Sequence, residues 1–386
     1  MRIEALLRSR PVELVLAAIA FCLGARFVPS WWCAREAPAW VEGRAEVQLA
    51  LARAVDSWIQ RDLERADFHT GSARFDGEWL FGSYVMAGMG FGQIALAHPE
   101  LGESMLPRMR RCARAALSAR ARRFDAQAWG EDPLQALDRE GSGDHAAYLG
   151  YLNLLLGLLV RLDPASEFAA LHARVSGFLA ARLAASPIGL LQTYPGEVYP
   201  VDNAAVVGSL GMRGSDHLRA WASRHRSQLV DPESGLLFQR VDARSGEGAG
   251  LPRGSHTALA VYFSSFADPD LACELFDALR AELAGSVLGF GMLREAPEGV
   301  DVGWGDIDSG PVLFGRSISA TGFAIGASRI CGDEALFARL LATAWLFGAP
   351  HESGGALELT SGGPLGNALL LAMLTAPAAR PAEERP

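Results

Sequence analysis

Acidic, histidine and aromatic residues recur in this sequence directly before apolar stretches with helix-forming composition. One such segment is Phe75-Asp-Gly-Glu-Trp, and another is Gly143-Asp-His. Carboxylates and imidazoles are the side chains that most often transfer protons in enzymes, and aromatic rings bind apolar or sugar surfaces. These residue types therefore predict a site for acid/base chemistry on a small molecule.

The candidate residues fall into two groups by expected role. We expect the catalytic residues to be Asp76, His145, Glu197 and Asp308. We expect the substrate to be bound by Glu78, Trp79, Tyr84, Tyr148, Tyr199, Asp202, His256, Trp304 and Asp306. Asp76 and His145 form the expected acid/base couple, with Asp308 and Glu197 as orienting or proton-sharing partners. Helix capping is the alternative role for an acid such as Asp202, but it explains neither the histidines nor the aromatic residues.

Six apolar stretches rich in small residues follow these polar segments. They recur about every 52 to 61 residues, and such a period is typical of a repeat architecture. We expect the six helices to begin near residues 82, 145, 202, 256, 310 and 364. A helix that is apolar on all sides belongs inside the protein, so these six helices are predicted to form an inner ring.

A second kind of helix alternates with the first and has an apolar stripe and a polar face, as amphipathic surface helices do. The expected ranges are 46–66, 106–121, 163–185, 216–229, 268–283 and 333–347. Alternation of the two kinds predicts an all-α fold, an (α/α)6 toroid over residues 46–376. Short turns make paired helices antiparallel, so all inner helices run in the same direction. Their N-terminal ends, with the polar residues, should then meet at one mouth of the ring.

The N-terminal segment has the order expected of an export signal or a membrane anchor. Arg2, Arg8 and Arg10 precede an apolar run that Trp31 and Trp32 follow. We expect residues 1–33 to form this unit and residues 12–32 to be the membrane-associated helix. The basic flank predicts a cytoplasmic N-terminus and a toroid outside, in the periplasm if the cell is bacterial. Residues 377–386, rich in proline and glutamate, are expected to be a disordered tail.

Composition excludes several classes of function. The net charge is −9, which argues against nucleic acid as a partner. The chain contains no lysine, so Schiff-base and pyridoxal chemistry are excluded. None of the five cysteines lies in a CxxC or zinc-site pattern. Cys112, Cys273 and Cys331 lie in apolar helical patterns, and we expect them to be buried free thiols without disulfides.

The loops resemble those of the linalool dehydratase/isomerase family. The resemblance is carried by Phe75-Asp-Gly-Glu-Trp, by Gly143-Asp-His-Ala-Ala-Tyr-Leu-Gly-Tyr and by Tyr194-Pro-Gly-Glu-Val-Tyr-Pro-Val-Asp-Asn. It implies an (α/α)6 barrel that acts on an allylic alcohol by acid/base chemistry without a metal or organic cofactor. It also implies that Asp76 is the acid near the first inner helix and His145 the histidine on the second. In the third loop the family has cysteines, whereas this chain has Glu197, Tyr199 and Asp202.

Three functions from different classes follow from these observations. The first is a cofactor-independent lyase or isomerase acting on a small apolar alcohol, as the resemblance implies. The second is a glycoside hydrolase or polysaccharide lyase, with carboxylates such as Asp76 and Asp308 as acid and base and Trp79 or Trp304 as a sugar platform. The third is a ligand-binding toroid without catalysis, which the absence of any perturbed titratable group would favour.

Overall fold

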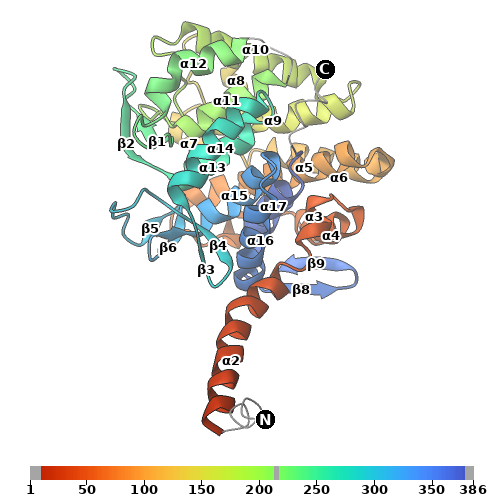
Figure 1. The fold of residues 1–386 in the computed structure, drawn as a ribbon. Coiled ribbons are helices and arrows are strands. Elements are labelled where there is room, and N and C mark those ends of the chain that lie inside the picture. Colours follow the sequence, from red (N-terminus) through yellow and green to blue (C-terminus); the bar gives the residue numbers. More distant parts are fainter. Residues whose placement is uncertain (1–9, 213–216, 379–386) are drawn as a thin grey trace.

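The computed structural model describes residues 10–212 and 217–378, and these form a closed ring of six parallel inner helices (Figure 1). The inner helices are α5 (Ala73–Ala97), α9 (Ala146–Leu162), α11 (Pro200–Gly211), α13 (Gly254–Ser264), α15 (Ile318–Ile330) and α17 (Gly363–Leu374). Each packs against the next, and α17 closes the ring on α5. The structure thus confirms the predicted all-α (α/α)6 toroid.

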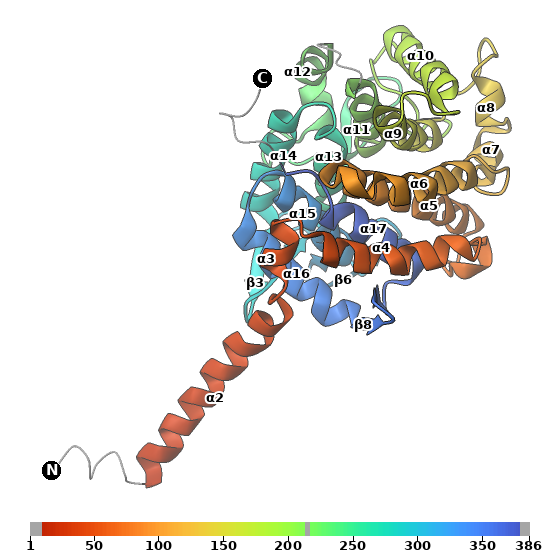
Figure 2. The ribbon, with the colours of Figure 1, turned by 90° about the vertical axis from the view of Figure 1, so that its right-hand side faces the viewer.

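Six outer helices surround the ring, and each packs against an inner helix. They are α4 (Ala45–Gln60), α6 (Gly102–Ala116), α10 (Ala169–Ala185), α12 (His217–Leu229), α14 (Pro269–Leu283) and α16 (Glu334–Gly348). Connections from an inner helix to the next outer helix are short. Connections from an outer helix to the next inner helix are longer and contain additional structure. In Figure 2, α7 (Arg123–Trp129) and α8 (Pro133–Ala136) lie on one side of the toroid and β3 (Ala284–Val287) lies on the other, beside α3 (Ala37–Val41) and the top of α2 (Arg10–Cys33). Asp216, the expected start of the fourth outer helix, lies outside the described residues.

Short helices and strands occupy these longer connections. The short helices include α7 (Arg123–Trp129) and α8 (Pro133–Ala136), both between α6 and α9. The first hairpin is β1 (Phe238–Val241) with β2 (Gly248–Pro252), and the last is β8 (Pro350–Ser353) with β9 (Ala356–Leu359). A five-stranded antiparallel sheet, in the order β3-β4-β7-β6-β5, lies between α14 and α15. Its strands are β3 (Ala284–Val287), β4 (Phe290–Arg294), β5 (Gly305–Asp306), β6 (Gly310–Leu313) and β7 (Arg316–Ser317).

Two predicted helix starts are wrong, and both errors come from glycines. The first inner helix begins at Ala73 and not near residue 82, because its glycines are sites of close packing within the helix. A Cβ atom on Gly88 would lie 2.5 Å from Leu155 Cδ1 and 3.1 Å from Cys112 Cβ, so glycine at this position lets α9 and α6 pack closely against α5. The fifth begins at Ile318 and not near residue 310, since Gly310 starts strand β6.

The N-terminal helix α2 (Arg10–Cys33) projects away from the toroid (Figures 1 and 2). The short helix α3 (Ala37–Val41) connects it to α4. Its apolar side chains are largely exposed, among them Leu14, Phe21 and Trp31. A helix of this length and composition is consistent with a membrane span or signal anchor. Arg2 and Arg8, on which the expected orientation partly depends, lie outside the described residues, as do residues 379–386 of the expected tail.

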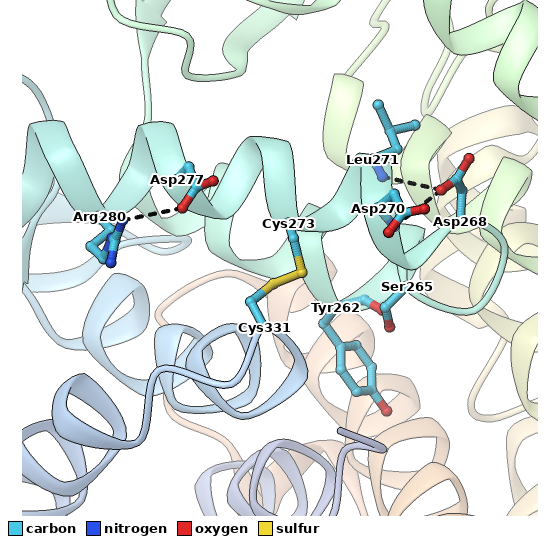
Figure 3. Close-up of a disulfide and its surroundings, with 9 residues drawn as sticks. All are labelled: Tyr262, Ser265, Asp268, Asp270, Leu271, Cys273, Asp277, Arg280 and Cys331. Carbon is cyan, nitrogen blue, oxygen red and sulfur yellow. Dashed lines mark hydrogen bonds and ion pairs between the residues drawn. A yellow bond between two sulfur atoms is a disulfide. The ribbon is translucent and has the colours of Figure 1, made fainter. Parts of the chain in front are cut away.

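The structure contains a disulfide that the sequence analysis does not predict (Figure 3). Cys273 of α14 is bonded to Cys331, which directly follows α15. The prediction of free thiols at these two positions is therefore wrong, whereas Cys112 is a buried free cysteine as expected. Tertiary structure brings the two cysteines together because α14 and α15 are neighbouring elements of the ring. The bond fixes the end of an inner helix to the outer helix that precedes it.

Candidate active site

Glu78 is the residue with the most strongly altered chemistry at the mouth of the ring. It lies on the second turn of α5, and the Tyr194 hydroxyl donates a hydrogen bond of 2.9 Å to its Oε2 atom. Burial, together with the negative charges of Asp308 and Asp202, raises the pKa of Glu78 from 4.5 to about 8. A carboxyl group with this pKa is mostly protonated at neutral pH, so Glu78 can donate a proton.

Asp202 is a second carboxyl group with a raised pKa. It lies in the first turn of α11 and accepts hydrogen bonds from the Tyr151 hydroxyl at 3.0 Å and the Thr193 hydroxyl at 2.8 Å. Burial raises its pKa to about 6, although these hydrogen bonds and the nearby His256 oppose the shift. Asp202 is therefore mainly ionised at pH 7, and its charge helps to keep Glu78 protonated.

Asp308 is an exposed carboxylate that faces the same group of residues. Its Oδ2 atom lies 3.6 Å from Nε2 of His256, which is in the first turn of α13. The same oxygen lies 3.9 Å from Nη1 of Arg253. The Asp308 side chain is about half exposed, so a substrate or water molecule can reach it. Glu78, Asp202, His256 and Asp308, which we call the mouth cluster, come from α5, α11, α13 and the β5–β6 turn.

Arg253 holds the β5–β6 turn in place. Its guanidinium is buried and donates two hydrogen bonds to Asp306, of 2.7 and 2.8 Å, and one of 2.8 Å to Glu295. Burial opposes ionisation of Asp306, but the Arg253 bonds outweigh it and lower the Asp306 pKa to about 2. The Asp306 carboxylate also accepts the backbone amides of Asp308 and Ser309. Asp306 is thus a permanent anion that positions Asp308.

Asp76 is held by a local network at the start of α5. Its Oδ1 atom accepts hydrogen bonds from the Thr70 amide at 2.9 Å and from the Thr70 hydroxyl at 2.7 Å. Burial acts to raise the pKa of Asp76, but the Thr70 bonds outweigh it, so the pKa is below its usual value. Asp76 is consequently ionised at neutral pH. A group in this state is poorly suited to donate a proton, and its contacts are those of a residue that fixes a loop to a helix.

His145 is fully buried in a separate network, with 0% of its side chain exposed. Its Nδ1 atom lies 2.6 Å from Asp125 Oδ2, its Nε2 atom lies 3.5 Å from Glu131 Oε1, and its ring packs on Trp129. Burial raises the pKa of Asp125 despite the histidine beside it. We call His145, Asp125, Glu131 and Trp129 the buried cluster. Its partners come from α7 and from the segment after it, and they separate the imidazole from solvent.

The remaining expected residues are divided between the mouth and the core. Tyr84 and Tyr148 are buried, and their hydroxyls donate to the backbone carbonyls of Leu63 at 3.2 Å and Ala116 at 3.0 Å. The ring of Trp79 packs edge-on against Phe68 and is partly buried.

Two aromatic side chains, those of Tyr199 and Trp304, do lie among exposed groups. The Tyr199 ring packs edge-on against His256, and its hydroxyl donates to the exposed Glu197 at 3.1 Å. Trp304, next to β5, is 85% exposed. These rings are available to a ligand that approaches the β5–β6 turn.

Sequence reasoning missed the groups that orient the acids. Tyr151 and Thr193 bind Asp202, and Glu295 binds Arg253. A tyrosine within an apolar inner helix was the available signal for Tyr151, since a buried hydroxyl needs a partner. Within residues 10–212 and 217–378, no three histidine, cysteine, aspartate or glutamate side chains are grouped as ligands for a metal ion.

No family model and no curated protein matches this chain. Solved structures do match it. One, described as a C. acetobutylicum ATCC 824 glycoside hydrolase from family 105, has a TM-score of 0.52 at 9% sequence identity over 77% of this chain and 93% of that chain. Another, described as a glycosyl hydrolase of family 88 from Bacteroides vulgatus, has a TM-score of 0.35 at 11% identity over 77% of this chain and 98% of that chain. At such identities, the first likeness establishes the toroid fold.

These findings correct the predicted function. The resemblance of the loops to linalool dehydratase/isomerase implies a lyase or isomerase acting on an apolar alcohol, and that prediction is wrong. The solved structure that shares the toroid fold is described as a glycoside hydrolase and not as a linalool dehydratase/isomerase. The expected preference for a lyase or isomerase over a glycosidase is wrong as well.

Proposed function

We propose that this protein is a glycoside hydrolase whose acid and base are Glu78 and Asp308. The observation that carries the proposal is the position of Glu78 at the mouth of the ring, where the Tyr194 hydroxyl binds it at 2.9 Å and where burial and the nearby Asp308 and Asp202 raise its pKa to about 8. Most glycoside hydrolases use one carboxylic acid and one carboxylate that flank the glycosidic bond. A toroid that only binds a ligand does not need a carboxyl group with so high a pKa, so this feature favours an enzyme.

The reaction follows from the two protonation states. Glu78 donates its proton to the glycosidic oxygen as the bond from that oxygen to the anomeric carbon breaks. A water molecule attacks the anomeric carbon, and Asp308 accepts a proton from it. His256 lies within 3.6 Å of Asp308 and positions this carboxylate, while Asp202 keeps Glu78 protonated until the reaction begins. Trp304 offers an exposed aromatic surface for the sugar ring.

A polysaccharide lyase is less well supported. Elimination next to a uronic acid requires a cation or hydrogen-bond donor to neutralise the substrate carboxylate. The buried Arg253 already binds Glu295 and Asp306 and would have to release one of these partners in order to bind a substrate carboxylate. The exposed Arg74 also lies close to Glu78, over the Tyr194 ring, so a lyase would depend on this arginine. The proposed hydrolase needs only Glu78 and Asp308 for the reaction.

The decisive test is one isosteric substitution on α5, Glu78→Gln. Glu78→Gln removes the proton donor, and we expect kcat on aryl glycosides or polysaccharides to fall by about 10³-fold or more, because general acid catalysis and bond cleavage are coupled. The melting temperature should stay within a few degrees of that of the unaltered protein. Reducing-sugar release measures the first quantity, and circular dichroism the second. Full activity of Glu78→Gln would refute the proposal.

We also propose that α2 anchors the protein in a membrane, with the toroid on the extracytoplasmic side. Two independent observations support this topology. The apolar side chains of α2 are exposed and need a lipid environment. The disulfide between Cys273 and Cys331 is of a kind found in oxidising compartments. Recovery of the intact protein as a soluble cytosolic species with reduced thiols would contradict both the membrane anchorage and the extracytoplasmic location of the toroid.

A further inference from the structure

The turn between β3 and β4 exposes apolar side chains where a polar residue is usual. Leu288 and Gly289 form this two-residue turn, with φ angles of 52° and 87°. Such turns favour asparagine or aspartate before the glycine, since those residues adopt positive φ more easily. Here the position holds leucine, which is 50% exposed, next to Val287, which is 53% exposed. Neither local conformation nor packing within the toroid explains this choice of residue.

The turn lies against the N-terminal helix. A Cβ atom on Gly289 would lie 2.3 Å from Ser30 Oγ and 3.9 Å from the Arg26 carbonyl, so glycine is required for this approach. Both ribbon views place the β3–β4 hairpin beside the end of α2 that joins the toroid (Figures 1 and 2). The hairpin is held there by α16, because the Thr343 hydroxyl donates a hydrogen bond of 2.6 Å to the Gly291 carbonyl. Its position relative to α2 is therefore fixed.

The contact also sets the depth of the turn in a membrane. Trp31 and Trp32, which are 67% and 57% exposed, follow the contact residues along α2 toward the toroid. Tryptophan is enriched at the boundary between lipid tails and headgroups. Each residue advances a helix by about 1.5 Å, so Ser30 lies within one turn of these rings. If the two tryptophans mark the interface, the Leu288 side chain lies at the same depth.

We propose that the β3–β4 turn is a second membrane contact, in which Val287 and Leu288 enter the lipid interface beside α2. This inference rests on the proposed membrane anchorage of α2. The partner is the lipid bilayer itself, because the exposed apolar residues of the turn continue the exposed apolar surface of α2. A helix alone would let the toroid rotate about its axis, whereas two contacts fix its orientation.

A fixed orientation has a consequence for the substrate. The membrane-side turn and the β5 strand, which carries Asp306, lie at opposite edges of one five-stranded sheet. Four strand spacings of about 4.8 Å place β5 about 19 Å across the sheet from β3. The mouth cluster is then held at a constant distance from the lipid surface. Such an enzyme is suited to glycans attached to, or lying on, that surface.

The same sheet provides a matched control. Phe314 and Gly315 form the corresponding turn between β6 and β7, with φ angles of 51° and 73°, and the Phe314 side chain is fully exposed. Strand pairing of Arg294 with Arg316 places this turn at the opposite end of β4 from Leu288. The two turns thus share conformation and exposure but differ in their proximity to α2.

The test uses the full-length protein in vesicles of phosphatidylglycerol and phosphatidylcholine. Cys22 and Cys33 are first replaced by serine, and Cys112 is retained because it is buried. An environment-sensitive fluorophore is then attached to Leu288→Cys, to Phe314→Cys, or to Ala18→Cys in α2. Lipids that carry a spin label near the headgroup should quench the label at position 288 by about half or more and the label at position 314 little, and lipids that carry it deep in the acyl chain should quench the label at position 18.

Three results are informative. Quenching at 18 and 288 but not at 314 supports the proposal. Quenching at 18 alone overturns the second contact and leaves the anchorage intact. Absence of quenching at both 18 and 288 overturns the anchorage, and the second contact with it. If Leu288→Cys does not fold, as judged by circular dichroism, Val287→Cys carries the label in its place.

Discussion

Two groups of histidine and carboxylate side chains lie near the start of inner helices, and they differ in what surrounds them. In the mouth cluster, His256 faces the half-exposed Asp308 at 3.6 Å. In the buried cluster, His145 is bonded to Asp125 at 2.6 Å and covered by Trp129. The residue types are the same, yet only the first arrangement can contact a substrate. Access to solvent, and not residue type, therefore distinguishes a site for chemistry from a structural network.

The largest difference between substitutions in the two clusters should be the loss of activity in Asp308→Asn. This change removes the proposed base while keeping the size of the side chain, so we expect kcat to fall by about 10² to 10⁴-fold. The matched control is Asp301→Asn, since Asp301 is exposed in the same connection and accepts a hydrogen bond from the nearby Gly303 amide at 2.8 Å. Asp301→Asn should retain activity. Equal losses in both variants would show that the connection as a whole, and not the Asp308 carboxylate, affects turnover.

Substitutions in the buried cluster should lower the stability of the protein and leave its activity unchanged. His145→Ala leaves the Asp125 carboxyl group buried without its partner and places alanine at a φ of 52°, so we expect unfolding to become easier by about 3 kcal/mol. His145→Asn should lose less, because asparagine tolerates this φ and can donate a hydrogen bond. Chemical denaturation measures both changes. Activity per folded molecule should be preserved, and its loss in the stable Asn variant would assign His145 to the catalytic machinery.

The difference between the two clusters also shows which features of the structure could be predicted from the sequence. The alternation of two helix types predicted the toroid and the meeting of inner-helix N-termini, because periodicity depends on local composition. The state of His145 could not be predicted, since its neighbours Asp125, Trp129 and Glu131 lie in a connection whose packing has no periodic signal. His145 and His256 have similar surroundings in the sequence, Gly-Asp-His and Gly-Ser-His. Both imidazoles are buried, and only the three-dimensional structure shows that His256 faces an exposed carboxylate whereas His145 faces a buried one.

A third prediction concerns pH and again contrasts the clusters. The pKa of Glu78 is raised to about 8, so the acid is protonated below that pH and activity should fall as pH rises through 8. The same shift affects stability: the contribution of protonated Glu78 is complete below pH 4.5, its usual pKa, and is lost as pH rises toward 8. Glu78→Gln should therefore reduce the loss of stability between these values. His145→Asn should leave the pH at which activity falls unchanged. A change in that pH would show that the buried cluster influences the pKa of Glu78.

The smallest effect is expected for Asp76, the residue that the sequence most strongly indicated as the acid. Its carboxylate accepts two hydrogen bonds from Thr70, and its pKa is lowered, so it is already ionised when the enzyme is active. Asp76→Asn retains one acceptor oxygen but removes the charge, and we expect unfolding to become easier by about 1 kcal/mol. Thermal denaturation should show this change, and kcat should fall by less than about threefold.

Thr70→Val tests the structural role of Asp76 by changing the residue that donates hydrogen bonds to it. It removes the hydroxyl that donates to Asp76 while keeping the backbone amide and the shape of the side chain. If Asp76 is structural, both changes should lower the melting temperature, and Thr70→Val should lower it more because the Thr70 hydroxyl also contacts the Ser72 backbone. The double variant should lower it by less than the sum of the two, because both changes weaken the same hydrogen bond between Thr70 and Asp76. If instead Asp76→Asn abolishes turnover while Thr70→Val does not, the acid lies on the first turn of α5, and Glu78 is the residue that orients it.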